Sequence, residues 1–123
     1  MRKIVAMRIL TIAFTTVLLL VISGCGQSYN PERDKDCPGC DLIGVQLESA
    51  NLSGADLAGA DLSRASLSYA DFTGANLAGA DLTVADLTNA NLYDANLTVA
   101  KLDDVIGADF TGALNVPEKY LKY

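Results

Sequence analysis

A five-residue cycle of apolar and polar positions runs without interruption through the middle of the chain. Alanine stands at every fifth position from Ala50 to Ala100, and two residues after each alanine comes a large apolar residue. That residue is leucine in every unit except one, where Phe72 takes its place. Between the two stands Asp or Asn in nine of the eleven units, with Ser66 and Lys101 as the exceptions. A fixed period of this kind is stronger evidence for a fold than local propensity.

The period of five fits neither a straight helix nor a straight strand. Successive leucines would lie about 140° apart around an α-helix, and on a strand they would alternate between the two faces. A chain that turns a corner every five residues keeps both apolar positions of a unit inward and the Asp or Asn outward. The last two residues then form the turn, and several of them are glycines, namely Gly54, Gly59, Gly74 and Gly79. Four corners close a coil of about 20 residues, and coils are expected to stack about 4.8 Å apart.

The unit Ala-(Asp/Asn)-Leu-x-x resembles the repeat of pentapeptide-repeat proteins. The resemblance implies an all-β fold, specifically a right-handed quadrilateral β-helix. We predict this solenoid over residues 35–114. Each buried leucine is expected to contribute about 1.5–3 kcal/mol, so the large apolar residues from Leu42 to Leu102 are sufficient for a core.

The register of the repeat extends beyond the strict run at both ends. Cys37 falls at a position of the large apolar residue, and Cys40 falls at a position of alanine. From Leu102 to Phe110 the spacing is eight residues instead of five. This spacing predicts an insertion of three residues around positions 103–107, which would bulge from the coil or bend its axis.

The last residues of the chain, 115–123, have lost the pattern and are predicted to form a carboxyl-terminal cap. The open end of a solenoid needs a cover. The side chains predicted to fold back over the last coil are Tyr120, Leu121 and Tyr123.

The amino-terminal segment has the charge pattern of a signal peptide. Three basic residues, Arg2, Lys3 and Arg8, precede fourteen residues without a charge, 9–22. That run is shorter than the roughly 20 residues of a membrane-spanning helix but has the length of a signal-peptide core. We predict a helical signal peptide over residues 1–24.

The tetrapeptide Ile22-Ser23-Gly24-Cys25 follows directly and resembles the lipobox of bacterial lipoproteins. The resemblance implies cleavage between Gly24 and Cys25 and lipidation of Cys25 by a diacylglyceryl group with acyl chains such as palmitate. Residues 25–34 would then form a lipidated tether to a membrane. An ordinary cleaved secretion signal with a free cysteine, or an uncleaved membrane anchor, are the alternatives.

The lipoprotein hypothesis places the protein in the bacterial cell envelope. Gly26 stands where an aspartate often signals retention at the inner membrane in enterobacteria. By that analogy, the periplasmic face of the outer membrane is favoured if the organism is Gram-negative.

Composition and charge exclude one class of partner. The chain has no histidine and no tryptophan, and from Cys25 onward it carries fifteen acids against six bases, a net charge of −9. A surface that binds nucleic acid needs clustered Lys and Arg, so nucleic acid is not an expected partner.

Cys37-Pro38-Gly39-Cys40 is the one compact motif with reactive side chains. A redox site would need a thiol of low pKa, usually at a helix N-terminus, and a zinc site would need two further ligands. A structural role puts both sulfurs inward as an amino-terminal cap of the solenoid, joined or not as a disulfide outside the cytoplasm. A Cys-x-x-Cys opening also occurs in members of the family that the chain resembles, which favours structure. No metal or cofactor is predicted.

The outward carboxylates of the repeat do not indicate an enzyme. They are Asp56, Asp61, Asp71, Asp81 and Asp86, and Asn replaces them freely in other units. Acid–base catalysis would not accept that exchange. Some members of the family mimic DNA through an acidic surface and bind a topoisomerase, but a short exported solenoid would not reach one.

Off-motif side chains at turn positions indicate where a partner would bind. They are Arg64, Tyr69, Val84, Tyr93 and Val99, and positions twenty residues apart share a face. Scattered surface residues would look the same. The sequence thus predicts a membrane-anchored, non-enzymatic structural or interaction module with an unknown protein partner, with dimerisation through a solenoid end as a further possibility. The alternative is a thiol–disulfide or metal-handling envelope protein that uses Cys37 and Cys40.

Overall fold

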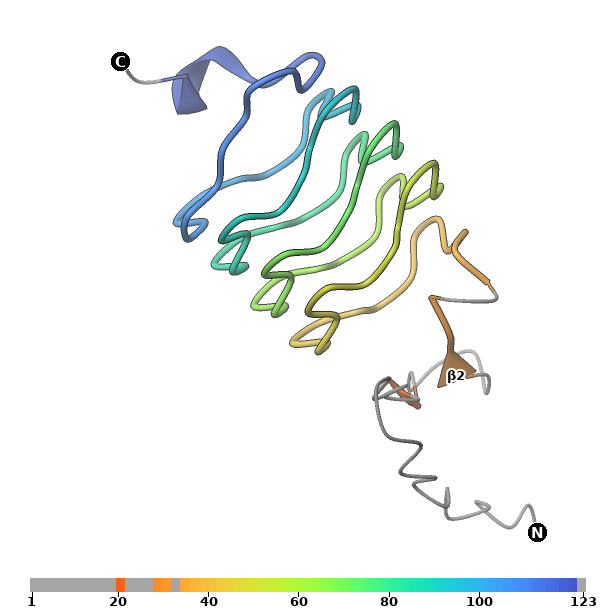
Figure 1. The fold of residues 1–123 in the computed structure, drawn as a ribbon. Coiled ribbons are helices and arrows are strands. Elements are labelled where there is room, and N and C mark those ends of the chain that lie inside the picture. The colour runs from red at the N-terminus through yellow and green to blue at the C-terminus, as the bar shows by residue number, and fades with distance from the viewer. Residues whose placement is uncertain (1–19, 22–27, 32–33, 122–123) are drawn as a thin grey trace, which may run out of the picture.

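The computed structural model describes residues 20–21, 28–31 and 34–121, and its main body is a stack of coils (Figure 1). Isolated parallel bridges join the outward residue of a unit, usually Asp or Asn, to the equivalent residue twenty positions later, from Asp41↔Asp61 onward to Asp86↔Ile106. Because a unit has five residues, an offset of twenty means four units per coil. The predicted coil with four corners is therefore present.

Each side of a coil contributes a single bridge, so the solenoid itself contains no regular strand. The regular elements in the described part of the chain are two short strands and one 3₁₀ helix. Strands β1 (Leu20–Val21) and β2 (Ser28–Tyr29) pair antiparallel before the first coil, and η1 (Glu118–Tyr120) follows the last coil.

In units that carry an Asp or Asn, such as residues 60–64, every backbone N–H has a hydrogen-bond partner, which explains the preference for these residues. Three of the five N–H groups bond to neighbouring coils, one closes the preceding turn, and one bonds to the Asp or Asn side chain of its own unit. In residues 60–64 these bonds are Ala60 to Leu57 O (3.0 Å), Asp61 to Cys40 O (2.8 Å), Leu62 to Asp81 O (2.7 Å), Ser63 to Asp61 Oδ1 (3.0 Å) and Arg64 to Thr83 O (2.9 Å). Without the carboxylate or amide oxygen, the first turn N–H would lack a protein acceptor.

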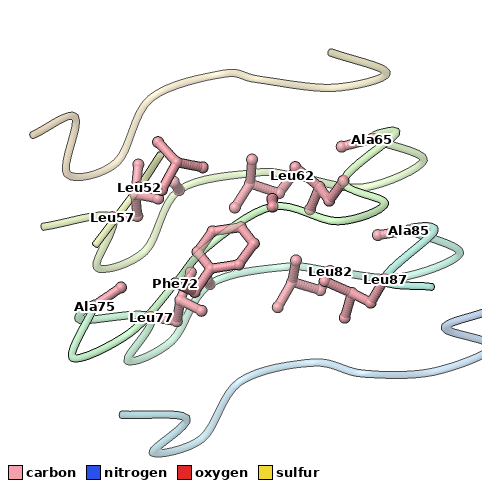
Figure 2. Packing of buried hydrophobic residues seen from close by; sticks show 14 of the residues in the cluster. Leu52, Leu57, Leu62, Ala65, Phe72, Ala75, Leu77, Leu82, Ala85 and Leu87 are labelled. Atoms are coloured by element: carbon pink, nitrogen blue, oxygen red, sulfur yellow. The ribbon is translucent and has the colours of Figure 1, made fainter. Parts of the chain in front are cut away.

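The core is a column of alanine and leucine side chains inside the coils, as the repeat predicted. Every large apolar residue from Leu52 to Leu102 is at most 2% exposed, and the alanines from Ala55 to Ala100 are at most 7% exposed. Phe72 fills the middle of this column, between Leu52 and Leu57 on one side and Leu82 and Leu87 on the other (Figure 2). The small alanine at the start of each side leaves room for the leucines.

The corners are tight turns that require a left-handed residue. The alanine N–H bonds back to the carbonyl three residues earlier, as from Ala55 to Leu52 at 3.1 Å, and the residue before the alanine has a positive φ. This is the geometry that favours glycine. Val84 (φ 60°) and Val99 (φ 50°) adopt it although they are β-branched, at a cost of about 1–2 kcal/mol each.

The segment after Leu102 differs from the prediction made from spacing. Asp104 still forms an ordinary corner with φ 57°, and Ile106 still bridges Asp86 at an offset of twenty. The next bridge, Asn96↔Leu114, has an offset of only eighteen. The coil therefore lacks two residues, and the predicted insertion of three residues around 103–107 is wrong.

The missing residues are the turn pair that should follow Gly107. The backbone of Gly107 instead cuts across the corner and packs on Thr88, so that a Cβ at residue 107 would lie 2.9 Å from the Thr88 Cα. Only glycine fits this contact. The repeat then resumes, with Phe110 at the position of the large apolar residue, as expected.

The carboxyl-terminal residues cover the last coil through Tyr120. Its ring packs against the core, and its hydroxyl donates to Asp103 Oδ2 at 2.9 Å. Lys119 lies over that ring at 4.4 Å and forms an ion pair with Asp103 Oδ1 at 3.2 Å. The predicted cap is confirmed for Tyr120, whereas Leu121 is 45% exposed and Tyr123 lies outside the described residues.

Most of the predicted signal peptide, including Gly24 and the lipidation residue Cys25, lies outside the described residues. Of residues 1–24 the structure describes only Leu20 and Val21, which form a strand instead of the expected helix. In the part of the chain that is described, no helix has the length and hydropathy needed to cross a membrane.

Candidate functional site

Cys37 and Cys40 form a disulfide across the first corner of the solenoid, with their Cα atoms 5.4 Å apart. Both occupy regular repeat positions. The N–H of Cys37 donates to Asp56 O at 2.8 Å, the N–H of Cys40 closes the turn to Cys37 O at 3.2 Å, and Cys40 O accepts from Asp61. The half-buried sulfur residues pack against the hydrophobic core. The pair thus takes the places of a leucine and an alanine at the open end of the coil.

Tyr29 completes this amino-terminal cap, although no pattern in the sequence indicated it. It lies in the segment predicted to be a tether, yet it is only 4% exposed and belongs to the core cluster. Its hydroxyl donates to Lys35 O at 3.1 Å. Burial, with a smaller effect of the negative charge on Asp36, raises the pKa of the Tyr29 hydroxyl far above its usual value.

Lys35 ties the same cap to the body of the first coil. Its Nζ donates to Asn51 Oδ1 at 3.1 Å and lies 3.5 Å from Ser53 O. Tyr29, Lys35, Cys37 and Cys40 therefore seal one end of the core with contacts that no other coil uses. We refer to these four residues as the amino-terminal cap.

Two features of the described residues bear on redox and metal chemistry at the disulfide. The described residues contain one helical segment, η1, and it lies at the opposite end of the solenoid (Figure 1). Neither sulfur is therefore at a helix N-terminus, the usual means of lowering a thiol pKa. Within residues 20–21, 28–31 and 34–121, no three His, Cys, Asp or Glu side chains are grouped in a way that could hold a metal ion.

The outward aspartates are occupied by the turns that follow them. Asp71 Oδ1 accepts from the Thr73 N–H at 3.0 Å and the Thr73 hydroxyl at 2.5 Å, and Asp86 accepts the same two bonds from Thr88 at 3.0 and 2.6 Å. These bonds lower the pKa of both carboxyl groups, with the threonine hydroxyl as the main cause. An ionised carboxylate held in this way is a structural acceptor.

Asparagine performs the same function and adds bonds between coils. Asn76 Oδ1 accepts from the N–H of Ala78 at 3.3 Å, while its Nδ2 donates to Asp56 Oδ1 at 3.0 Å in the preceding coil. Asn96 in turn donates to Asn76 Oδ1 at 3.4 Å. The interchange of Asp and Asn follows from this shared role, as the sequence suggested.

One column of acids lies along the side that carries Asp41, Asp61 and Asp81. Lys101 ends this column and forms an ion pair with Asp81 Oδ2 at 3.0 Å. The hydroxyl of Thr83 and the bond from Lys101 together lower the Asp81 pKa. The exception Lys101 in the repeat is thus explained, because a fourth acid in this column would add repulsion.

The off-motif side chains predicted to mark a binding face are exposed, but they do not form a single patch. Tyr69 (64%) and Val84 (43%) lie with Arg64 on the two corners that flank Ser66. Tyr93 (56%) and Val99 (75%) lie on the corners that flank Asn96, on another side of the coil.

Comparison with known proteins decides the family. A family model described as pentapeptide repeats matches residues 40–77 and 65–104, with eight copies of the repeat. The chain belongs to the pentapeptide-repeat family. Proteins of this family form a right-handed β-helix and are generally non-enzymatic structural or interaction proteins.

The chain is also similar to solved structures of pentapeptide-repeat proteins. One from the thylakoid lumen of Arabidopsis thaliana is 35% identical, with a TM-score of 0.56, over 68% of this chain and 67% of that protein. HetL, involved in heterocyst differentiation regulation in Nostoc sp. strain PCC 7120, is 38% identical, with a TM-score of 0.35, over 58% of this chain and 35% of HetL. QnrB1, a plasmid-mediated fluoroquinolone resistance protein, is 22% identical, with a TM-score of 0.40, over 64% of this chain and 42% of QnrB1. No curated protein matches the sequence.

Proposed function

We propose that the protein is a membrane-anchored lipoprotein whose pentapeptide-repeat solenoid is a non-catalytic module for binding another protein. The observation that carries the anchor is the tetrapeptide Ile22-Ser23-Gly24-Cys25 directly after an uncharged run of fourteen residues. Two or three acyl chains on Cys25 would hold the domain stably at a membrane, since each buried methylene contributes about 0.8 kcal/mol.

The oxidised pair Cys37–Cys40 supports a location outside the cytoplasm, where disulfides persist. The domain would stand close to the membrane, because its amino-terminal cap begins at Tyr29, four residues after the proposed lipidated cysteine. The periplasmic face of the outer membrane is the proposed site if the organism is Gram-negative.

Mass spectrometry of the membrane fraction tests the anchor. In cells that express the full chain, we expect a mature protein that begins at Cys25 and carries a diacylglyceryl modification. Cys25→Ser should lose both the modification and the membrane association. The double variant Cys37→Ser/Cys40→Ser is the matched control and should retain both. An unmodified Cys25 in the mature protein would overturn the proposal.

The binding role is supported by the way the repeat uses its side chains. Inward residues fill the core, and outward Asp and Asn oxygens bond to the turns. The corner side chains are the ones that the fold leaves free to vary. Recognition by this family member would therefore depend on its corners and ends.

The half-exposed disulfide also favours a second candidate, a thiol–disulfide exchange protein. Reduced protein would then reduce a disulfide substrate such as insulin faster than the Cys37→Ser/Cys40→Ser variant does. The structural role predicts equal rates, together with a lower melting temperature of the variant. A clear rate difference between two folded proteins would favour exchange chemistry.

A further inference from the structure

The side of the solenoid that carries Asn96 is apolar and nearly free of charge in its last two coils. We define the Asn96 face as the corners beside one bridged column and the column itself, which consists of Asn76, Asn96 and Leu114. Its exposed large apolar side chains are Tyr93 (56%), Val99 (75%) and Leu114 (46%). Among the described residues 34–121, which hold fourteen acids and four bases, this face contributes one charged residue, Asp94. An exposed apolar patch within an acidic surface is typical of an interaction site.

The opposite side of the same coils also exposes an apolar residue, but charges surround it. Ile106 is 53% exposed and stands at an outward position, as Leu114 does. Asp86 lies one coil below Ile106 in the same column, and Asp104 forms the corner before it. Acidic surfaces of two copies repel each other, so the Asn96 face is the side on which two copies can approach with the least repulsion.

The fold holds the Asn96 face in shape. The Tyr93 ring lies on the backbone of Gly112, where a Cβ at residue 112 would be 2.9 Å from the ring Cε2. The side-chain oxygen of Asn96 accepts from the Thr98 N–H at 3.2 Å, the Thr98 hydroxyl at 2.6 Å and Asn115 Nδ2 at 3.2 Å. Burial of this face would therefore leave that oxygen with its bonds, and a tyrosine that is already packed loses little freedom on binding.

The proposed lipid anchor indicates which surface meets this face. Tyr29 closes the amino-terminal end of the solenoid four residues after Cys25. With Cys25 in a membrane, every copy has that end at the membrane, so neighbouring stacks are parallel and present the Asn96 face at the same height. Confinement to the membrane also raises the effective concentration of one copy near another. A twofold axis parallel to the stacks then brings the same face of both copies together.

We propose that two membrane-anchored copies of the chain pair side by side through the Asn96 face. Leu114 lies at the centre of the face and meets the partner's Leu114. Tyr93 and Val99 lie on opposite corners at nearly the same height, so Tyr93 meets the partner's Val99. Asp56, the next acid of the column, lies two coils below Asn96, about 10 Å away and outside the contact. This inference rests on the proposed anchor and goes beyond the binding of a different protein.

Photo-crosslinking in intact cells tests the pairing with the full chain. Two versions that carry different tags are expressed together, each with a benzophenone amino acid in place of Tyr93. In the matched control the same amino acid replaces Tyr69, an exposed tyrosine (64%) on a corner beside the opposite side. We expect an adduct that contains both tags from position 93 and not from position 69. Its crosslink should lie within a few residues of Val99.

A charge at the centre of the face makes the test specific. Leu114→Asp introduces a residue type that the repeat uses at this outward position, so the fold should tolerate it, but it places two carboxylates opposite each other in the pair. The adduct from position 93 should fall roughly tenfold or more. Ile106→Asp is the matched control on the opposite side and should leave the adduct unchanged. Because both side chains are close to half exposed, the circular dichroism spectra of both variants should match that of the parent chain, which excludes unfolding as the cause.

The remaining outcomes separate this inference from the proposed anchor. If Cys25 is lipidated, an adduct from position 93 that is absent, indifferent to Leu114→Asp or formed with a different protein would overturn the pairing and leave the anchor standing. An adduct between copies from a probe at Leu121, near the carboxyl-terminal end, without one from position 93 would show end-to-end association and would also overturn it. An unmodified Cys25 in the mature protein would overturn the anchor, and with it the parallel arrangement.

Removal of the anchor completes the test. Cys25→Ser should lower the adduct from position 93, because it abolishes confinement to the membrane. An adduct that is unchanged in Cys25→Ser would contradict the role of the anchor in the pairing.

Discussion

The middle of the solenoid and its two ends protect the same core by different means. In the middle, each leucine is covered by identical coils above and below, and residues such as Leu62 and Leu77 are fully buried. At the ends there is no next coil, so single residues cover the core instead. Tyr29 with the disulfide closes one end, and Tyr120 with its bond to Asp103 closes the other. The comparison shows that stacking of repeated coils stabilises the middle of the solenoid. Its two ends depend instead on side chains that have no equivalent in the other coils.

The largest expected effect is at the centre of the column. Phe72→Ala should lower the free energy of unfolding by about 3–5 kcal/mol, because the ring is fully buried between coils that cannot collapse into the space. Chemical denaturation would measure it. Phe72→Leu restores the residue of the other units and should cost about 1.5 kcal/mol or less. Phe110→Ala, at the half-buried equivalent in the last coil, should cost clearly less than Phe72→Ala, and equal losses would contradict the comparison.

Loss of the disulfide should weaken the amino-terminal end to a smaller extent. Reduction of Cys37–Cys40 is expected to lower the free energy of unfolding by about 2 kcal/mol, the value for a very short closed loop. The melting temperature with and without a reductant measures it. A protein with both cysteines replaced by serine should melt at a lower temperature than the oxidised parent and should not respond to the reductant. An unchanged melting temperature on reduction would mean that Tyr29 closes this end without the disulfide.

Relief of strain at a corner should have a still smaller effect, and in the opposite direction. Val99→Gly is expected to raise the free energy of unfolding by about 1 kcal/mol, because valine with φ 50° is strained and its side chain is 75% exposed. The reverse change one coil earlier, Gly79→Val, should lower it by about 1–2 kcal/mol, since the added side chain meets open space but the same strain. If Val99→Gly destabilised the protein, Val99 would have a packing role that the structure does not show.

Acid should gradually weaken the hydrogen bonds that the turns donate to the outward aspartates. The carboxyl groups of Asp71, Asp86 and Asp109 have a lower pKa in the folded protein than in the unfolded chain, chiefly because threonine hydroxyls donate to them. Their contribution is complete above the unfolded pKa of about 4 and is lost as the pH falls through the lower folded pKa. The melting temperature should therefore be level above about pH 5 and fall below about pH 4.

A conservative variant isolates one of these groups. Asp86→Asn keeps an oxygen for the turn, as Asn91 does for Tyr93, but it removes a titrating carboxyl group. The decline of its melting temperature in acid should be slightly shallower than that of the parent. A steeper decline would contradict the assigned sign.

The sequence was sufficient to predict the features that recur in every repeat unit. The inward Ala and Leu, the outward Asp and Asn, and the register of Cys37 and Cys40 all follow from one period, because each unit meets the same neighbours. Lys101 stood out in the sequence only as an exception to the repeat, and its ion pair with Asp81 became apparent from the structure.

Structural features that occur only once could not be predicted from the five-residue period. The spacing of eight after Leu102 equals one unit plus three residues or two units minus two. The bridge Asn96↔Leu114 and the contact of Gly107 with Thr88 show that the second is correct. Tyr29 lies in a polar segment with no periodicity, so nothing in the sequence indicated that it would enter the core.

Residue-resolved hydrogen exchange of backbone amides tests most directly whether stacked coils, closed by unique end contacts, hold the fold. The amides of Leu62 and Leu77 donate to the next coil in the middle of the stack, whereas those of Leu42 and Ala113 lie at its ends. We predict the slowest exchange for the two central amides and faster exchange at both ends, with the rate at Leu42 rising further when Cys37–Cys40 is reduced. Equal protection along the whole stack, or slower exchange at the ends than in the middle, would contradict this account.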